Sequence, residues 1–377
     1  VYFEIPLALM GREMLMGSTI SEITNNGFGS VGEKPKGLLY ISFVRCDSVI
    51  SLKQLTAQYD TNEENLKQRI KESTIPATIK NFKITTYNED STAVVIDMTD
   101  YLVSADEAIN PFSPWAPILA GGERVMEKEF RRENSQVVSI KAFEDNVSVK
   151  SSLTYGLSLK NKVMYIFQRE PFTAVMTRSF ILLPEHPMRP RLADPRIAIF
   201  SQGVSVFNGD SRGAQARYYA QRWNLEPKDM EQYRKGVLTE PKKPIVFYVD
   251  DAFPAMWKEP VRKAALRWNV AFEKIGLKNV IQVRDFPKDD PTFDPDNLKY
   301  SCIRYVPAAI TNAMGPSWTD PRTGEIINAS VIIFNDVVKL ANQWRFLQTS
   351  QVDPSVRTKK MPDNILEESI EYIVAHE

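Results

Sequence analysis

The feature that most constrains this chain is a succession of short apolar runs, rich in β-branched and aromatic residues, between positions 1 and 183. Polar turns separate the runs, and residues 82–98 have the pattern of a strand, a turn at Asn88-Glu89-Asp90, and a second strand. Such spacing is typical of antiparallel sheets. The sequence therefore predicts a β-rich sheet or sandwich domain over residues 1–185. Further strands are expected at 37–46, 136–143, 147–157, 162–167 and 173–182, and one helix at about 52–73.

The pattern changes twice after residue 185. Residues 186–243 combine closely spaced prolines and arginines with large aromatic side chains, which favours an ordered connector that wraps a neighbouring domain. From 244 to 377, strand-like and helix-like segments alternate. Residues 254–275 have the apolar spacing of an amphipathic helix, which Gly276 would end. The expected fold class is α+β, in which an incomplete α/β domain follows the β-rich domain.

Charge and composition exclude several classes of partner. The chain has 47 Lys and Arg residues against 47 Asp and Glu, so its net charge is zero. We therefore expect no nucleic-acid partner, and no apolar run is long enough for a transmembrane segment. Cys46 and Cys302 make no metal-binding spacing, and buried free thiols are expected rather than a disulfide. No pattern specifies an oligomeric state.

The sequence contains two histidines, and one of them precedes a glutamate. His186 lies in a Pro-Glu-His-Pro loop, where a surface or packing role is expected. His376 lies on a helix expected to begin at Pro362-Asp363, and Glu377 follows it directly. Zinc peptidases carry His-Glu-x-x-His on a helix, where the imidazoles bind the metal and the glutamate acts as general base. The alternative is a helix-end histidine that the helix dipole stabilises.

A second apolar run precedes that helix. Residues 329–335 are rich in β-branched side chains and follow the turn-forming sequence Asp320-Pro-Arg-Thr-Gly324. We expect a strand at the edge of a cleft, which can bind an extended peptide by strand addition. An ordinary core strand is the alternative. The residues assigned to substrate binding are Ala329, Ser330, Val331, Ile332 and Ile333.

Three segments carry a resemblance to a known family: residues 320–331, residues 268–276, and the proline- and arginine-rich residues 187–196. They resemble parts of multi-domain bacterial zinc metallopeptidases of metzincin type, which are common in Bacteroidetes and contain domains of unknown function. The β-rich start resembles the domain that precedes the peptidase in that family. By this resemblance, residues 244–377 would be the N-terminal part of a metzincin-like catalytic domain.

The resemblance also implies a site. His376 would be the first ligand of a Zn²⁺ cofactor and Glu377 the catalytic base, in a motif whose other ligands this sequence does not contain. It implies a peptide or protein substrate and a secreted, periplasmic or cell-surface location. Because catalytic zinc needs three protein ligands, we expect this chain alone to bind zinc weakly and not to hydrolyse peptides.

Other functions compete with this interpretation. The main alternative is a catalytically inactive secreted binding or scaffold protein with a peptidase-like fold. A glycoside hydrolase would need a pair of cleft carboxylates, and no spacing singles one out. The acidic residues between 285 and 296 are interpreted as a solvated loop, with calcium binding as the alternative. The Asp320–Gly324 sequence is interpreted as a turn.

Overall fold

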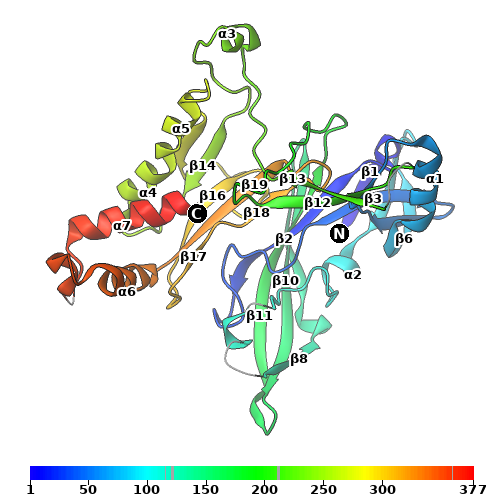
Figure 1. The fold of residues 1–377 in the computed structure, drawn as a ribbon. Helices are drawn as coiled ribbons and strands as arrows, with labels where there is room; N and C mark the ends of the chain where they lie inside the picture. The colour runs from blue at the N-terminus through cyan, green and yellow to red at the C-terminus, as the bar shows by residue number, and fades with distance from the viewer. Residues whose placement is uncertain (115, 120–122, 210–212, 359) are drawn as a thin grey trace. The chain divides into compact units, whose positions relative to one another are not determined.

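The computed structural model of the protein describes residues 1–114, 116–119, 123–209, 213–358 and 360–377. These residues form two compact units (Figure 1). The first comprises Val1–Arg222, Asp296–Leu298 and Thr319–Ile326. The second comprises Trp223–Pro295, Lys299–Trp318 and Ile327–Glu377. The predicted connector, 186–243, is therefore divided between the two units.

A ten-stranded antiparallel sheet dominates the first unit. Its strands are β1 (Tyr2–Pro6), β2 (Met14–Ile23), β3 (Leu39–Cys46), β4 (Val49–Gln54), β6 (Ala77–Tyr87), β7 (Ala93–Asp97), β8 (Val125–Phe130), β9 (Gln136–Ala142), β10 (Asn146–Lys160) and β11 (Tyr165–Leu182). They follow the order β1-β7-β6-β4-β3-β2-β11-β10-β8, and β9 pairs with a separate stretch of β10. The predicted strand, turn and strand at 82–98 is confirmed as β6 and β7.

The two longest strands, β10 and β11, place apolar side chains of both strands on one face of this sheet. Leu153 pairs with Ala174 and Tyr155 pairs with Phe172, and all four residues are buried. Because successive strand residues point to opposite faces, alternate positions produce one continuous apolar surface. Phe112, from a loop, packs on the rings of Tyr155 and Phe172. Burial of each large apolar side chain contributes about 1.5–3 kcal/mol.

Smaller elements complete the first unit. A three-stranded sheet has the order β13-β12-β5 and consists of β5 (Tyr59–Asp60), β12 (Ser201–Val206) and β13 (Gln215–Ala220). The short helices are η1 (Leu7–Leu9), α1 (Glu64–Ser73), α2 (Thr99–Leu102), η2 (Pro117–Leu119) and η3 (Arg132–Asn134). The helix expected at 52–73 is confirmed only from Glu64 onward. Leu52 is instead fully buried in β4, where pairing with β6 decides its conformation.

The second unit is built on a six-stranded sheet. Its strands are β14 (Ile245–Val249), β15 (Ile281–Asp285), β16 (Ser301–Val306), β17 (Ala313–Met314), β18 (Ser317–Thr319) and β19 (Ile326–Phe334). The order is β15-β14-β16-β19-β17, and β18 also pairs with β19. Strands β14, β15, β16 and β19 run parallel, whereas β17 is antiparallel to β19. The helices are α3 (Met230–Arg234), α4 (Ala255–Arg267), α5 (Asn269–Glu273), α6 (Val337–Thr349), η4 (Pro354–Arg357) and α7 (Asp363–His376).

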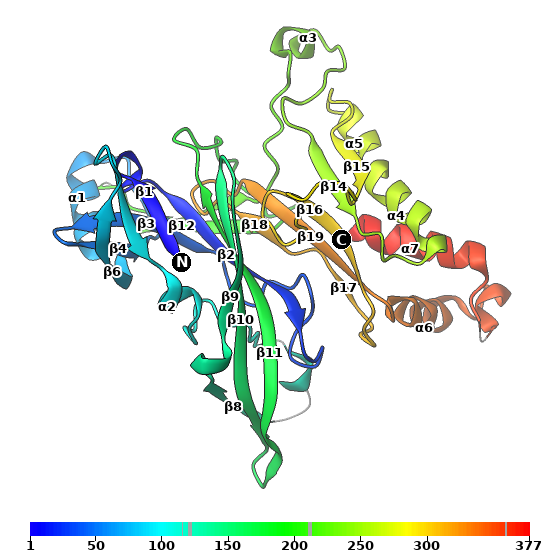
Figure 2. The same cartoon turned by 180° about the vertical axis from the view of Figure 1, so that it is seen from behind.

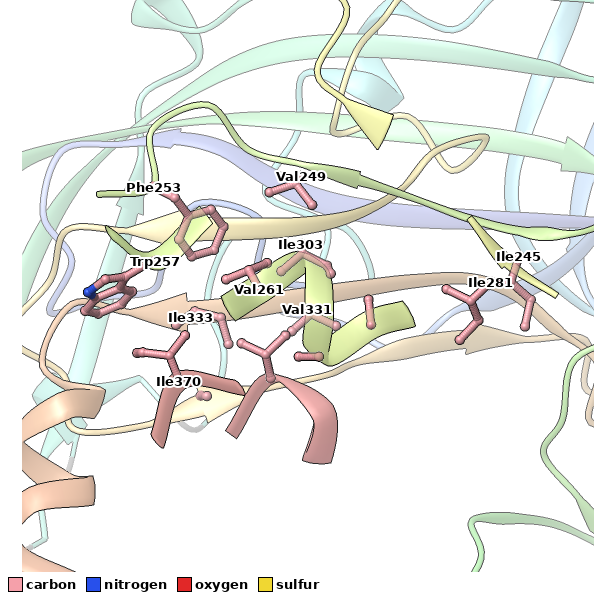
Figure 3. Packing of buried hydrophobic residues seen from close by; sticks show 14 of the residues in the cluster. Ile245, Val249, Phe253, Trp257, Val261, Ile281, Ile303, Val331, Ile333 and Ile370 are labelled. Carbon is pink, nitrogen blue, oxygen red and sulfur yellow. The ribbon is translucent and has the colours of Figure 1, made fainter. Parts of the chain in front are cut away.

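Helices α4 and α7 pack on one face of this sheet (Figure 2). Val261 of α4 and Ile370 of α7 lie against Ile303 and Val331 of the strands in a buried apolar cluster (Figure 3). The predicted helix at 254–275 is confirmed as α4 and α5, and Gly276 follows with a φ of 87°, as its predicted capping role requires. None of the helices in the described ranges is long and apolar enough to cross a membrane.

The predicted fold class, α+β with an incomplete α/β metzincin-like catalytic domain, is wrong. Of the described residues, 39% lie in strands and 21% in helices, and the main feature is a large curled antiparallel sheet. Nothing in the described part of the chain supports an α/β metzincin catalytic domain. Apolar periodicity misled the prediction for two reasons. It does not reveal strands as short as β17 and β18, and it does not show how far one sheet extends through the chain.

Candidate functional site

Helix α7 positions both residues of the His-Glu pair. It begins after Pro362, and Asp363 in its first turn complements the positive end of the helix dipole. Ile370 and Val374 are buried against the sheet, and Glu377 follows Ile370 on the same face after two helical turns. Glu377 is therefore partly buried, whereas the neighbouring His376 is exposed.

Glu377 lies against the backbone of Gly315, the residue that follows β17. The N–H of Gly315 donates a hydrogen bond to the Glu377 side chain. A Cβ at position 315 would overlap the main-chain oxygen of Glu377. Burial raises the pKa of Glu377 above its usual value, while the charge of His376 and the Gly315 hydrogen bond lower it by less. The raised pKa makes this carboxylate a better proton acceptor than an exposed glutamate.

The last turn of α7 is tied to the end of α4. The indole Nε1 of Trp268 donates a hydrogen bond to the main-chain oxygen of Ala375 at 2.9 Å. One turn earlier, Arg267 Nη1 donates to Glu371 Oε1 at 2.9 Å. The last carbonyl groups of a helix have no partners within it, so the indole satisfies one of them. These two bonds hold the main chain that carries His376 and Glu377.

Two hollows flank the end of α7. The first, of about 700 Å³, lies between α6 and α7 and is lined by Trp344, Tyr372, His376 and Glu377. The second, of about 640 Å³, lies between α5 and α7, and Trp268, Tyr372 and His376 are among its lining residues. Both volumes lie in the range of small-molecule or side-chain binding pockets. The exposed imidazole thus borders two hollows.

The structure confirms a strand at 329–335 but contradicts its expected position at a free edge. Ala329 to Ile333 lie inside β19, which pairs with β16 on one side. On the other side, Ile332 and Ile333 pair with β17, and Ser330 N–H donates to Pro316 O at 2.9 Å. The backbone is therefore occupied on both sides and offers no edge for strand addition. The sequence did not indicate β17, which has two residues and no apolar pattern.

The Asp320-Pro-Arg-Thr-Gly324 segment forms the predicted turn. Arg322 donates from Nε and Nη2 to the Asp320 carboxylate, at 3.0 and 2.7 Å, and Gly324 has a φ of 76°. The Asp194-Pro-Arg196 tripeptide closes in the same way, with an Arg196 Nη2 to Asp194 Oδ2 distance of 2.6 Å. Both Asp-Pro-Arg sequences therefore have a structural explanation within the first unit.

The described residues do not complete a zinc site. The described residues contain no group of three His, Cys, Asp or Glu side chains that can hold a metal ion. Since catalytic zinc takes three protein ligands, His376 and Glu377 make no complete site with the rest of the described chain. His186 is an exposed loop residue of the first unit. Neither cysteine forms a disulfide in the described part of the chain: Cys302 is buried as expected, but Cys46 is exposed because it ends β3 at a hairpin turn.

Sequence reasoning missed two residues of this site. Gly315 was not distinguished from other loop glycines, because its importance comes from a neighbour distant in sequence. Trp344 lies in α6, a helix that the sequence analysis did not predict. Trp268 was expected as an apolar position of the helix at 254–275 and as part of the family resemblance, but not as a hydrogen-bond donor to α7.

Comparison with known proteins assigns the chain to a family. Residues 33–228 match the family described as Domain of unknown function (DUF5117). The matched span is more than half of the 377 residues, and the chain belongs to this family. No curated protein and no solved structure matches it. The matched residues do not include α7, so the match describes neither His376 nor Glu377.

Proposed function

We propose that this chain is part of a zinc-dependent peptidase that acts on peptides or proteins in a secreted, periplasmic or cell-surface location. One observation carries the proposal: Glu377 is partly buried, has a raised pKa, and borders a cavity beside His376. A glutamate directly after a histidine at the end of a helix matches the residue types and the order used in metal-assisted hydrolysis.

Glu377 is the proposed general base. Burial penalises its charged form, so its carboxylate takes a proton from a water molecule more readily than an exposed glutamate would. The Gly315 N–H orients this carboxylate, and the Trp268 bond to Ala375 holds the main chain next to it. A carboxylate held in this way can accept the proton of an attacking water and pass it to the amine leaving group.

His376 is the proposed first metal ligand. One imidazole does not hold a catalytic zinc, so we propose that the remaining ligands come from residues outside 1–377. Zinc, when bound, supplies Lewis acidity for the carbonyl group and the water. The 1–377 chain alone is expected to bind the metal weakly and exchangeably.

The proposed substrate is an extended peptide that lies along β17. This strand ends the sheet order, and among the described strands its partner is β19. A strand at an edge has free N–H and C=O groups that can pair with a peptide backbone. Gly315 follows β17 and contacts Glu377, so a peptide on this edge would pass close to the proposed base.

The test compares the 1–377 chain with a longer natural chain in which α7 continues. The longer chain should keep stoichiometric zinc through dialysis and cleave casein or a peptide library in a chelator-sensitive way, whereas the 1–377 chain should do neither. In the longer chain, Glu377→Gln should keep zinc but lose activity about 10²–10⁴-fold. The matched control, Glu367→Gln, removes an exposed charge from the same helix and should keep activity.

A binding or scaffold protein without catalysis is the second candidate. It is favoured by the lack, among the described residues, of any group of three metal-ligating side chains. A longer chain that binds zinc but cleaves no member of a broad peptide library would support this candidate. Stoichiometric zinc in the 1–377 chain would contradict the assignment of further ligands outside it.

A further inference from the structure

The hairpin of β10 and β11 ends in a rigid turn. Lys160 pairs with Tyr165, and residues 161–164 connect them. The side-chain oxygen of Asn161 accepts hydrogen bonds from the N–H groups of Val163 and Met164, both at 2.9 Å. The N–H of Asn161 also donates to Met164 O at 3.1 Å. The turn is therefore closed by its own hydrogen bonds and keeps its shape without a neighbouring element.

This turn presents large apolar side chains to solvent. Val163 is 83% exposed and Met164 65%, and Ile166 beside them is 49% exposed. Val125, which pairs with Lys160 from the neighbouring strand β8, is 55% exposed. We call residues 161–166 together with Val125 the hairpin tip. Hairpin turns usually carry Gly, Asn, Asp or Ser, so exposed apolar residues on a self-closed turn indicate a contact with an apolar partner.

Both lysines next to the turn form ion pairs, and Arg124 beside Val125 donates to the main-chain oxygen of Ile118. Lys160 Nζ lies 2.5 Å from Glu127, and Lys162 Nζ lies 2.5 Å from Glu123. The Tyr165 hydroxyl donates to Glu127 at 3.1 Å. The turn thus carries apolar side chains at its end, and a tyrosine and two lysine side chains beside them. Tyrosine is common at the membrane–water interface, and a lysine side chain can bury its apolar stem while its charged end stays in water. Both residue types therefore suit a position among lipid headgroups.

The shape of the tip argues against a protein partner. A stable protein interface takes about 800 Å² from each partner, which a turn of this length cannot offer. Within the first unit, the hairpin extends past the end of β8 in both views (Figures 1 and 2). A narrow, convex and apolar end suits insertion between lipid headgroups, where a large flat contact is not needed.

We propose that the hairpin tip inserts into the surface of a lipid bilayer, with Val163 and Met164 at the boundary of the acyl chains and Tyr165 among the headgroups. Lys160 and Lys162 are each paired with a glutamate, and Arg124 beside Val125 is a further cation that bonds to the main chain. Insertion of the apolar side chains rather than charge attraction is therefore the proposed source of binding, and anionic lipid is not required. Few side chains insert, so binding is weak and reversible. This contact would keep the protein close to a membrane whatever reaction α7 performs.

The test is sedimentation of the 1–377 chain with sucrose-loaded phosphatidylcholine vesicles. The unmodified chain should bind, and Val163→Ser with Met164→Ser should lower its partition coefficient about tenfold or more, as loss of burial of two apolar side chains predicts. The matched control, Val138→Ser with Ile140→Ser, changes two apolar side chains of β9 that are 54% and 49% exposed and should bind as the unmodified chain does.

Salt separates this mode of binding from an electrostatic one. Raising the salt concentration from about 0.05 to about 0.5 M should leave binding unchanged, because screening weakens only charge attraction. Three results would overturn the proposal: no binding to phosphatidylcholine vesicles, an equal loss in the β9 control, or binding that requires anionic lipid and disappears in salt. Unchanged circular dichroism melting of both double variants shows that the fold is intact.

Discussion

Gly315 and Glu377 form a reciprocal contact. The N–H of Gly315 donates to the side chain of Glu377, and the main-chain oxygen of Glu377 occupies the space that a Cβ at position 315 would need. The end of α7 and the loop after β17 therefore fit together only while position 315 lacks a side chain.

Replacing this glycine should move the end of the helix. Gly315→Ala introduces an atom where the backbone leaves no room, so we expect a loss of about 1–3 kcal/mol in the free energy of unfolding, measured by urea denaturation. Gly37→Ala is the control, because a Cβ there meets nothing within 4 Å. Equal effects of the two substitutions would show that the contact with Glu377 is unimportant.

The indole bond of Trp268 can be removed while the ring is kept. Trp268→Phe should cost about 0.5–1.5 kcal/mol, since it deletes the hydrogen bond to Ala375 O. Amide hydrogen exchange should accelerate in the last turn of α7 and stay unchanged in its first turn. Trp344→Phe, on the half-exposed face of α6, should leave exchange in α7 unchanged. Identical exchange in the two variants would rule out the tethering role.

The raised pKa of Glu377 predicts how the stability of the fold changes with pH. The folded state keeps the proton of this carboxyl to a higher pH than the unfolded state, so ionisation of Glu377 lowers stability as the pH rises above the usual carboxyl range. Glu377→Gln should therefore raise the melting temperature at neutral pH, and the gain should vanish below about pH 4.

Glu64 supplies a control of opposite sign. Its pKa is lowered, first by the hydrogen bond from Lys67 and also by the charge of that lysine. Its ionised form is the favoured one in the folded protein, so Glu64→Gln should lower the melting temperature slightly at neutral pH and have no effect in acid. A gain at neutral pH from both substitutions would mean that loss of negative charge, rather than burial, explains the result.

The two Asp-Pro-Arg turns provide a matched pair. Asp320 is fully buried and Arg322 is 14% exposed, whereas Arg196 in the other turn is 87% exposed. Arg322→Lys removes a buried two-bond contact and should cost about 1.5–3 kcal/mol. Arg196→Lys should change the free energy of unfolding much less, since exposed ion pairs contribute little. Chemical denaturation of both variants tests the difference, and a larger loss for Arg196→Lys would refute the explanation.

The parts of the fold that were predictable are those set by local pattern. Periodicity located β6, β7, α4 and α7, and the Asp320–Gly324 turn followed from its proline and glycine. The fold class was not predictable in this way, because sheet order depends on pairings between distant strands. Strand β19 shows the limit: its residues were identified correctly, but the two-residue strand that covers its edge was not.

The candidate site was predictable only in its residue types. The order His376-Glu377 was readable from sequence, and so was the helix that carries the pair. The partial burial of Glu377 was not, because it comes from Gly315 and from the packing of Ile370 and Val374 against the sheet. Exposure of Cys46 was missed for a related reason, since an apolar strand still ends at a solvated hairpin.

Residues 319–326 belong to the first unit, although much of the second unit precedes them in the chain. The first unit can therefore be completed only late in synthesis. The turn at Asp320 belongs to the first unit, where Arg322 bonds to the carboxylate of Glu13 at 2.5 Å. A ribosome must therefore make the first five strands of the second unit's sheet, β14 to β18, before this contact can form. The Glu13 carboxylate therefore lacks its Arg322 partner while about a hundred further residues emerge, at roughly 5–20 residues per second. A gene cut after Arg222 would never supply that partner.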